Sequence, residues 1–318
     1  LLGFYQLYKI LINHKFDIVQ YCTPKAALIA SLSSWLSGID IRLYCQWGIR
    51  YVGMQGLGRY IMKKIEKVTC LFSTHILPDS YGNLELSVSE GLYAKDKASV
   101  IHFGSAHGVE MTRFNLSKRD EWRKEIYTQL GINDAAFILG WVGRVTKDKG
   151  VGELITSFIE VAILDSSIHL IMVGPMEVCS GLSAEVIENI YNHPRIHYVS
   201  EQRKVEKYYA AMDIFVAPSY REGFGSVALE AQAMGLPVIA TDIPGTREAL
   251  VNGKTGILVP VRDTLSLITS IIKLKDNVGL RKIMGEEGVK YVPEHFEQNM
   301  FWEKVLEHRL EVIKRANT

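Results

Sequence analysis

Glu222 and Glu230 lie eight residues apart, and between them stands a turn of small residues, Gly223-Phe224-Gly225. A helix should begin at Ser226, since good helix formers follow it as far as a Gly-Leu-Pro stop at residues 235–237. The N-terminus of a helix binds anions through backbone N–H groups and its dipole, whereas carboxylates accept hydrogen bonds from neutral hydroxyls. A sugar attached to a nucleoside diphosphate offers both kinds of group. The alternative is a solvated loop glutamate followed by a glutamate on an exposed helix face.

A second pair of side chains, Arg144 and Lys149, follows an apolar segment, residues 136–143, that is typical of a buried parallel strand. Both cations would then lie in the loop at the carboxyl end of that strand, where Gly143 and Gly150 let the backbone approach a ligand closely. Arginine suits a forked grip on phosphate oxygens, and lysine supplies a point charge. Taken alone, the segment also fits an ordinary solvated basic loop.

Two predicted strands, within residues 211–219 and 236–242, bracket the glutamate motif. The motif is therefore expected at a strand–loop–helix junction, which is where open α/β sheets bind their ligands.

Residues 208–260 resemble the nucleotide-sugar domain of the family-4 retaining glycosyltransferases. The two glutamates match that family's E-x7-E motif, and residues 143–150 match its G-R-x4-K-G motif. The resemblance implies the α/β fold called GT-B, in which two Rossmann-like domains face each other across a cleft. The catalytic residues that it implies are Arg144, Lys149 and Glu222. The donor-binding residues that it implies are Gly143, Gly223, Phe224, Gly225, Ser226 and Glu230.

The resemblance also implies a role for each side chain. Arg144 and Lys149 grip the diphosphate, Glu222 holds hydroxyls of the donor sugar, and Glu230 holds the ribose hydroxyls. In this family the sugar is transferred with retention at the anomeric carbon, and the leaving phosphate oxygen is thought to take the acceptor's proton. A UDP-sugar is the expected donor. The expected acceptor is a glycan or a lipid-diphosphate-linked glycan in the synthesis of a capsule-type surface polysaccharide.

Other functions fit parts of the pattern. A UDP-sugar 2-epimerase of the GT-B fold is one, although the E-x7-E motif together with R-x4-K argues against it. A fragment that binds the nucleotide without turnover is another. A glycoside hydrolase is the weaker interpretation, because a second acid is not evident beside the glutamate pair. The sequence contains no metal-binding cluster, and we expect neither a metal ion nor another cofactor.

Composition indicates a soluble globular protein of one large or two ordinary domains, with 318 residues, 47% hydrophobic and 22% charged, and a net charge of +1. The four cysteines are scattered without metal-site or redox spacing, so we expect buried free thiols in the reducing cytoplasm. They are Cys22, Cys45, Cys70 and Cys179. No apolar run reaches the roughly 18 to 20 residues that a membrane span requires.

Charge divides unevenly along the chain. Residues 1–118 hold 13 Lys/Arg and 8 Asp/Glu (13 − 8 = +5), and the remainder holds 23 and 27 (23 − 27 = −4). The basic first part could face anionic lipid headgroups at the inner face of the plasma membrane, or a diphosphate-bearing acceptor. Residues 58–67 form a basic amphipathic stretch that suits a membrane-surface helix, although an ordinary surface helix fits it somewhat better. The pattern does not suggest nucleic acid as a partner.

The chain alternates between helical and strand patterns, which favours parallel sheets covered by helices. We expect an acceptor-side domain at 1–117, to which a helix at 297–318 returns, and a nucleotide-sugar domain at 118–296. Residues 109–115 resemble the family's inter-domain segment G-V-D-x-x-R-F.

The predicted elements of the first domain are helices at 7–13, 25–36, 58–67 and 83–90, and strands at 16–22, 40–45, near Cys70, at 75–77 and at 99–103. In the second domain a helix is predicted at 118–130. Its predicted strands are 138–142, 168–173, 196–199, 214–217, 238–241 and 256–259.

The chain departs from the family in two respects. It opens on a helix, so we expect the first domain to lack about one to two βα units relative to the family. Trp47 also stands where many capsule-type members carry a histidine. It could stack on a sugar face, but we rather expect it to pack in the core. His102 and His107 are expected to be structural or solvent-exposed.

Overall fold

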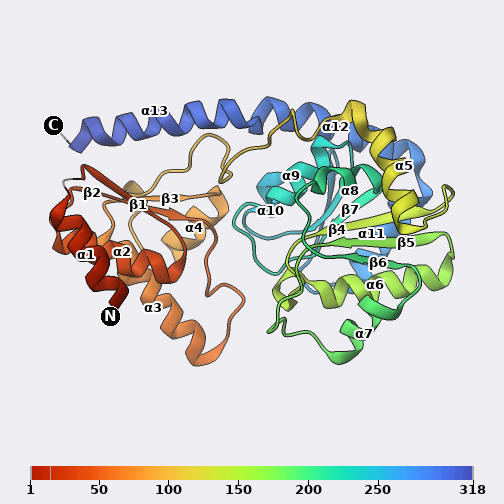
Figure 1. The fold of residues 1–318 in the computed structure, drawn as a ribbon, viewed down its shortest axis with the longest axis horizontal. Coiled ribbons are helices and arrows are strands. Elements are labelled where there is room, and N and C mark those ends of the chain that lie inside the picture. Colours follow the sequence, from red (N-terminus) through yellow and green to blue (C-terminus); the bar gives the residue numbers. More distant parts are fainter. Residues whose placement is uncertain (1, 15, 317–318) are drawn as a thin grey trace. The chain divides into compact units, whose positions relative to one another are not determined.

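A computed structural model of the chain describes residues 2–14 and 16–316 and divides into two compact units (Figure 1). Unit 1 takes in the chain up to His107, the segment Arg221–Phe224 and the C-terminal stretch from Asn299. Unit 2 consists of Gly108–Tyr220 and Gly225–Gln298. Every strand pair in both units is parallel, which confirms the α/β class predicted from the alternation of elements. The domain boundaries proposed from the sequence stay a prediction.

Unit 1 is built on a three-stranded sheet in the order β1-β2-β3, with α1, α2 and α3 on one side of it and α13 on the other (Figure 1). Its strands are β1 (Ile18–Tyr21), β2 (Ile41–Gln46) and β3 (His75–Pro78). Its helices are α1 (Leu2–Asn13), α2 (Pro24–Leu36), α3 (Gly56–Phe72), α4 (Tyr81–Ser89), the 3-10 turn η1 (Lys95–Lys97) and α13 (Gln298–Ala316), whose first residue belongs to unit 2.

Alternate residues of β2 face opposite sides of this sheet, as the two-residue period of a strand requires. Tyr44 packs with Ala27 and Cys70 against α2 and α3, whereas Leu43 and Cys45 belong to a separate apolar cluster.

Unit 2 is built on a six-stranded sheet in the order β6-β5-β4-β7-β8-β9. Its strands are β4 (Phe137–Val142), β5 (Ile168–Val173), β6 (Ile196–Val199), β7 (Ile214–Ala217), β8 (Val238–Thr241) and β9 (Gly256–Val259). Its helices are α5 (Arg119–Leu130), α6 (Val151–Leu164), α7 (Ala184–Asn192), α8 (Val205–Ala211), α9 (Ser226–Ala233), α10 (Thr246–Ala249), α11 (Thr264–Asp276) and α12 (Val278–Phe296), with 3-10 turns η2 (Leu116–Lys118) and η3 (Lys147–Lys149).

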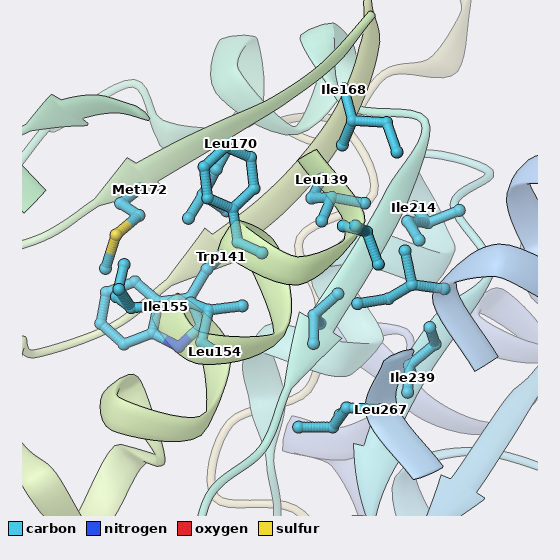
Figure 2. Close-up of a cluster of buried hydrophobic side chains, with 14 of the residues drawn as sticks. Leu139, Trp141, Leu154, Ile155, Ile168, Leu170, Met172, Ile214, Ile239 and Leu267 are labelled. Atoms are coloured by element: carbon cyan, nitrogen blue, oxygen red, sulfur yellow. The ribbon is translucent and has the colours of Figure 1, made fainter. Parts of the chain in front are cut away.

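The core of unit 2 explains why its strands could be predicted. β4 and β7 are central and covered by helices, so both faces of each strand are buried and the sequence is almost continuously apolar. Figure 2 shows Trp141 of β4 beside Leu154 and Ile155 of α6, and Leu139 of the same strand on the side of Ile214. The six strands predicted for this domain all form, and β4 starts one residue earlier than expected.

Two predicted strands of the first domain are wrong. Cys70 lies inside α3, fully buried among apolar side chains, because that helix continues to Phe72. Residues 99–103 also form no strand. After a single bridge between Ala98 and Ile76, the chain turns away, with Gly104 N–H donating to the carbonyl of Ile101 at 2.9 Å. The β-branched composition of both segments raised their apparent strand propensity, and tertiary packing decided otherwise.

The cysteines are free, as predicted, but they are not all buried. Cys45 and Cys70 are buried, Cys22 is half-buried and Cys179 is exposed. None of the helices formed by residues 2–14 and 16–316 combines the length and apolarity needed to cross a membrane.

The buried core of unit 2 gives a stability prediction. Leu139 is fully buried, whereas Leu265 on α11 is 73% exposed. Leu139→Ala should lower the free energy of unfolding by about 2–5 kcal/mol because it leaves a cavity, and Leu265→Ala should change it by no more than about 0.5 kcal/mol. Denaturant titration measures both, and equal effects of the two substitutions would contradict this placement of the core.

Candidate active site

The strand order of unit 2 contains a switch point between β4 and β7. From β4 the chain adds β5 and β6 on one side, and it then returns to place β7, β8 and β9 on the other. In open parallel sheets the loops that leave such neighbouring strands diverge and form a crevice at their carboxyl ends. The loop after β4 carries Arg144 and Lys149, and the loop after β7 leads into the glutamate motif.

These two loops are locked together. Tyr220 N–H donates to the carbonyl of Asp148 at 2.8 Å. Gly150 has φ +68°, and a Cβ placed on it would stand 1.9 Å from the carbonyl oxygen of Pro218. Only glycine therefore fits at position 150, for its backbone conformation and for lack of space. The side chain of Tyr220 adds an anchor, because its hydroxyl donates to Glu153 Oε1 of α6 at 2.5 Å.

Arg144 projects from the loop after β4 and is held by the loop after β5. Its guanidinium donates to Glu177 Oε1 at 2.5 Å, and the two side chains are 48% and 39% exposed. The backbones of the two loops also pair, since Val145 N–H donates to the carbonyl of Pro175 at 2.8 Å. A Cβ on Gly174 would lie 1.8 Å from the carbonyl oxygen of Gly143. The carboxylate thus holds a guanidinium that is about half exposed.

Lys149 is half-buried at the end of η3, directly before Gly150 and the start of α6. Arg144 and Lys149 therefore occupy one short loop, as the sequence predicts, at the carboxyl end of the central strand β4.

Helix α9 starts at Ser226, as predicted, and Gly225 before it has φ +82°. A Cβ on Gly225 would come within 3.1 Å of Thr246 Cγ2, so a side chain there is disfavoured both by the left-handed backbone and by its neighbour. The first turn of α9 carries no acidic residue, so the positive end of its dipole is not offset within the helix.

Glu230 lies on α9, half-buried, with a partner that the sequence did not indicate. Tyr209 of α8 donates its hydroxyl to Glu230 Oε2 at 2.9 Å, and Tyr209 is fully buried. Burial raises the pKa of Tyr209 well above its ordinary value, and the charge of Glu230 raises it further. Tyr209 therefore keeps its proton and orients the carboxylate.

Glu222 belongs to the short segment Arg221–Phe224, which is part of unit 1. Asn83 of α4 holds the backbone of this segment, since its Nδ2 donates to the carbonyl of Gly223 at 2.8 Å and to that of Glu222 at 3.3 Å. Gly223 has no room for a side chain, because a Cβ would lie 2.1 Å from Asp79 Oδ2.

Asp79 is itself unusual for a carboxylic acid. It is 4% exposed, and Asn83 Nδ2 donates to its Oδ1 at 3.2 Å. Burial raises the pKa of Asp79 to about 7, against the lowering effect of its hydrogen bonds from Asn83 and backbone N–H groups. The group therefore titrates near neutrality beside the glutamate segment.

The prediction for Trp47 is wrong. Its side chain is 50% exposed and lines a cavity of about 470 Å³ in unit 1, so it is not a core residue. It follows the end of β2, where Gly48 turns the chain with φ +77°, and so it lies beyond the packed part of the strand. His107 is exposed and His102 half-buried, as expected.

Sequence reasoning missed four residues that hold the candidate segments in place, three in unit 2 and one in unit 1, namely Gly174, Glu177, Tyr209 and Asn83. Gly174 directly follows β5 as Gly143 follows β4, and that repeated position was a usable signal. The other three act through partners far away in sequence, which no local pattern reveals. Among the described residues, no group of three or more His, Cys, Asp or Glu side chains is placed to hold a metal ion.

Comparison with solved structures places the fold in the GT-B class of glycosyltransferases. HepE from Anabaena, solved with UDP, matches with a TM-score of 0.82 and 17% identity, over 97% of this chain and 82% of its own. A glycosyltransferase from Rickettsia africae matches with a TM-score of 0.78 and 23% identity, over all of this chain and 81% of its own.

The chain belongs to the family of glycosyl transferases group 1, whose model matches residues 123–291, and it is a glycosyltransferase. It is 32% identical to the capsular polysaccharide biosynthesis glycosyltransferase CapM of Staphylococcus aureus, over 93% of this chain and 77% of CapM. It is 24% identical to the N,N'-diacetylbacillosaminyl-diphospho-undecaprenol alpha-1,3-N-acetylgalactosaminyltransferase of Campylobacter jejuni, over 99% of this chain and 82% of that enzyme.

The locked loops give a prediction with a built-in control. Gly150→Ala should lower the free energy of unfolding by roughly 3 kcal/mol, because it forces a left-handed alanine against Pro218. Gly152, two residues along in α6, has open space where a Cβ would go, so Gly152→Ala should leave stability unchanged or slightly raised. Denaturant unfolding compares the variants, and a Gly150→Ala protein as stable as the parent would show that the loops are not in contact.

Proposed function

We propose that the protein transfers a glycosyl group from a UDP-sugar, with retention at the anomeric carbon, to a glycan or lipid-diphosphate-linked glycan in capsule-type polysaccharide synthesis. One observation carries the proposal. The loop with Arg144 and Lys149 is locked to the loop after β7, and both leave the sheet of unit 2 at its switch point. Arg144, Lys149 and the N-terminus of α9 therefore follow strands at the carboxyl edge of the sheet, where open α/β sheets bind nucleotides.

The names and titles of similar proteins support a uridine nucleotide as the carrier of the donor sugar. HepE is described in complexes with UDP, with UDP and glucose, and with UDP-glucose. A 24% identical enzyme of Escherichia coli, which this chain covers over 69% of its length, is named as a UDP-Gal-dependent galactosyltransferase acting on a diphosphoundecaprenol acceptor. These names support a UDP-sugar donor and a lipid-diphosphate acceptor for this chain.

The chemical step separates charge. The bond between the anomeric carbon and the terminal phosphate oxygen breaks, and its electron pair stays on the diphosphate, while the sugar becomes oxocarbenium-like. The acceptor oxygen bonds to the same face of the anomeric carbon and gives its proton to the leaving phosphate oxygen. Arg144, Lys149 and the N–H groups of Phe224, Gly225 and Ser226 stabilise the growing negative charge, a task for which fixed donors need little reorganisation.

The carboxylates bind the neutral parts of the donor. Glu230, oriented by Tyr209, accepts hydrogen bonds from the ribose hydroxyls. Glu222 accepts from hydroxyls of the transferred sugar. Gly143 leaves the backbone accessible to the ligand, whereas the missing side chain of Gly223 makes room for Asp79. With two cations and a helix N-terminus neutralising the diphosphate, the proposal assigns no role to a metal ion or other cofactor.

The acceptor side of the proposal rests on CapM and on the two enzymes whose names contain diphospho-undecaprenol or diphosphoundecaprenol. An acceptor of that kind is lipid-anchored, so the enzyme would work in the cytoplasm at the inner face of the membrane, with its basic first part toward anionic headgroups.

Calorimetric titration tests the donor site. The parent should bind UDP more tightly than GDP or ADP. Arg144→Ala should weaken UDP binding by about ten- to a hundredfold, because it removes a charge-assisted contact to phosphate, and Glu230→Ala should also weaken it. Arg315→Ala, which removes a 77% exposed side chain on α13, is the matched control and should bind UDP like the parent.

Undiminished UDP binding by Arg144→Ala would contradict the proposed site. Conversion of a UDP-sugar to its 2-epimer without any acceptor, followed by NMR, would instead identify the protein as an epimerase.

A further inference from the structure

The solvent-facing side of α3 in unit 1 is apolar. At 3.6 residues per turn, its exposed side chains fall within an arc of about 120°. The stripe is made of Leu57, Tyr60, Ile61, Lys64, Lys67, Val68 and Leu71. Leu57 is 74% exposed, Leu71 67% and Tyr60 60%. A surface helix normally shows polar side chains on this side, so the arrangement requires an explanation.

The opposite side of α3 faces the core and carries the helix's one acidic residue. Glu66 is 3% exposed, and its Oε1 accepts hydrogen bonds from Tyr44 Oη at 2.9 Å and Gln46 Nε2 at 2.7 Å. Burial raises the pKa of Glu66 above its ordinary value. The outer face of α3 is thus free of negative charge from the helix itself.

The apolar stripe continues onto the end of α2. Trp35 is 50% exposed and Leu36 52%, and the ring of Trp35 lies 4.8 Å from that of Phe72, at the end of α3. We call these residues together with the α3 stripe the α2–α3 face. Contiguous exposed apolar side chains of this kind mark contact surfaces, and tryptophan and tyrosine favour the boundary between lipid and water.

Two lysines give the α2–α3 face its charge. Lys64 lies in the middle of the stripe and Lys67 at its margin, both exposed, and neither forms an ion pair with any residue that the structure describes. Lys64 Nζ stands 5.3 Å from the centre of the Tyr60 ring. The other two cations of the helix, Arg59 and Lys63, are instead paired with Glu90, at 2.6 Å and 2.5 Å.

We propose that the α2–α3 face docks on the surface of an anionic phospholipid bilayer, with α3 lying along the interface. Its apolar side chains would enter the boundary of the acyl region, while Lys64 and Lys67 extend to the headgroup phosphates. We choose a lipid surface as the partner because the positive charges of Lys64 and Lys67 complement anionic headgroups. The inference rests on the membrane location in the proposed function and deepens it by naming the face that docks, while its observations come from unit 1 alone.

Sedimentation with vesicles tests the proposal. The purified chain should pellet with vesicles of phosphatidylcholine and phosphatidylglycerol in equal parts, and less with phosphatidylcholine alone. The double variant Leu57→Ser/Leu71→Ser should bind the anionic vesicles at least about tenfold more weakly, because two exposed leucines no longer enter the lipid. Lys64→Glu/Lys67→Glu should lose the preference for anionic over neutral vesicles.

Leu265→Ser/Ile283→Ser is the control, since it removes two exposed apolar side chains of unit 2 and should bind vesicles like the parent. All variants should keep the parent's circular dichroism and UDP affinity, which separates this test from the test of donor binding. Failure of the parent to pellet with anionic vesicles would overturn the proposal. So would a concentration-dependent dimer that Leu57→Ser/Leu71→Ser abolishes, because the occupant would then be a second copy of the chain.

Discussion

The close approach of Gly150 to Pro218 is the constraint on which the candidate site depends. It joins the loop after β4, with its two cations, to the loop after β7, which leads into the glutamate motif. Tyr220 strengthens the junction, through its backbone to Asp148 and through its hydroxyl to Glu153. Burial raises the pKa of Tyr220 to about 12, so this hydroxyl remains a donor across the physiological range.

Electrostatics explains how acids and cations would share the proposed site. Two of the charged side chains are held by hydrogen bonds from a different segment of the chain. Arg144 donates to Glu177, and Glu230 accepts from the buried Tyr209. A phosphate binds best where donors are already fixed, and a hydroxyl binds best to an oriented carboxylate. In the proposed site, the loop after β4 would therefore bind the anion and α9 the hydroxyls, at one edge of the sheet.

The sequence predicted most where one physical signal dominated. The strands of unit 2 are buried on both faces, so their apolar runs stood out, and the helix start at Ser226 followed from Gly225 and the helix formers after it. The sequence-based prediction failed where tertiary contacts determine the secondary structure or the burial of a residue. Cys70 lies in a β-branched run that packing holds in α3, and Trp47 lies just past a strand end, where exposure depends on surroundings.

Residues that act through distant partners were also out of reach. Tyr209 is 21 residues from Glu230, and Glu177 is 33 residues from Arg144. The spacing of the two motifs indicated which side chains are candidates for binding the ligand, but not the groups that orient them.

Comparison of UDP with uridine tests the central claim most directly, which is that the loop after β4 holds the donor's phosphates. The account predicts that Lys149→Met weakens UDP binding about tenfold or more while leaving uridine binding unchanged, because the lysine contacts only phosphate. An equal loss for both ligands, or none for either, would contradict it.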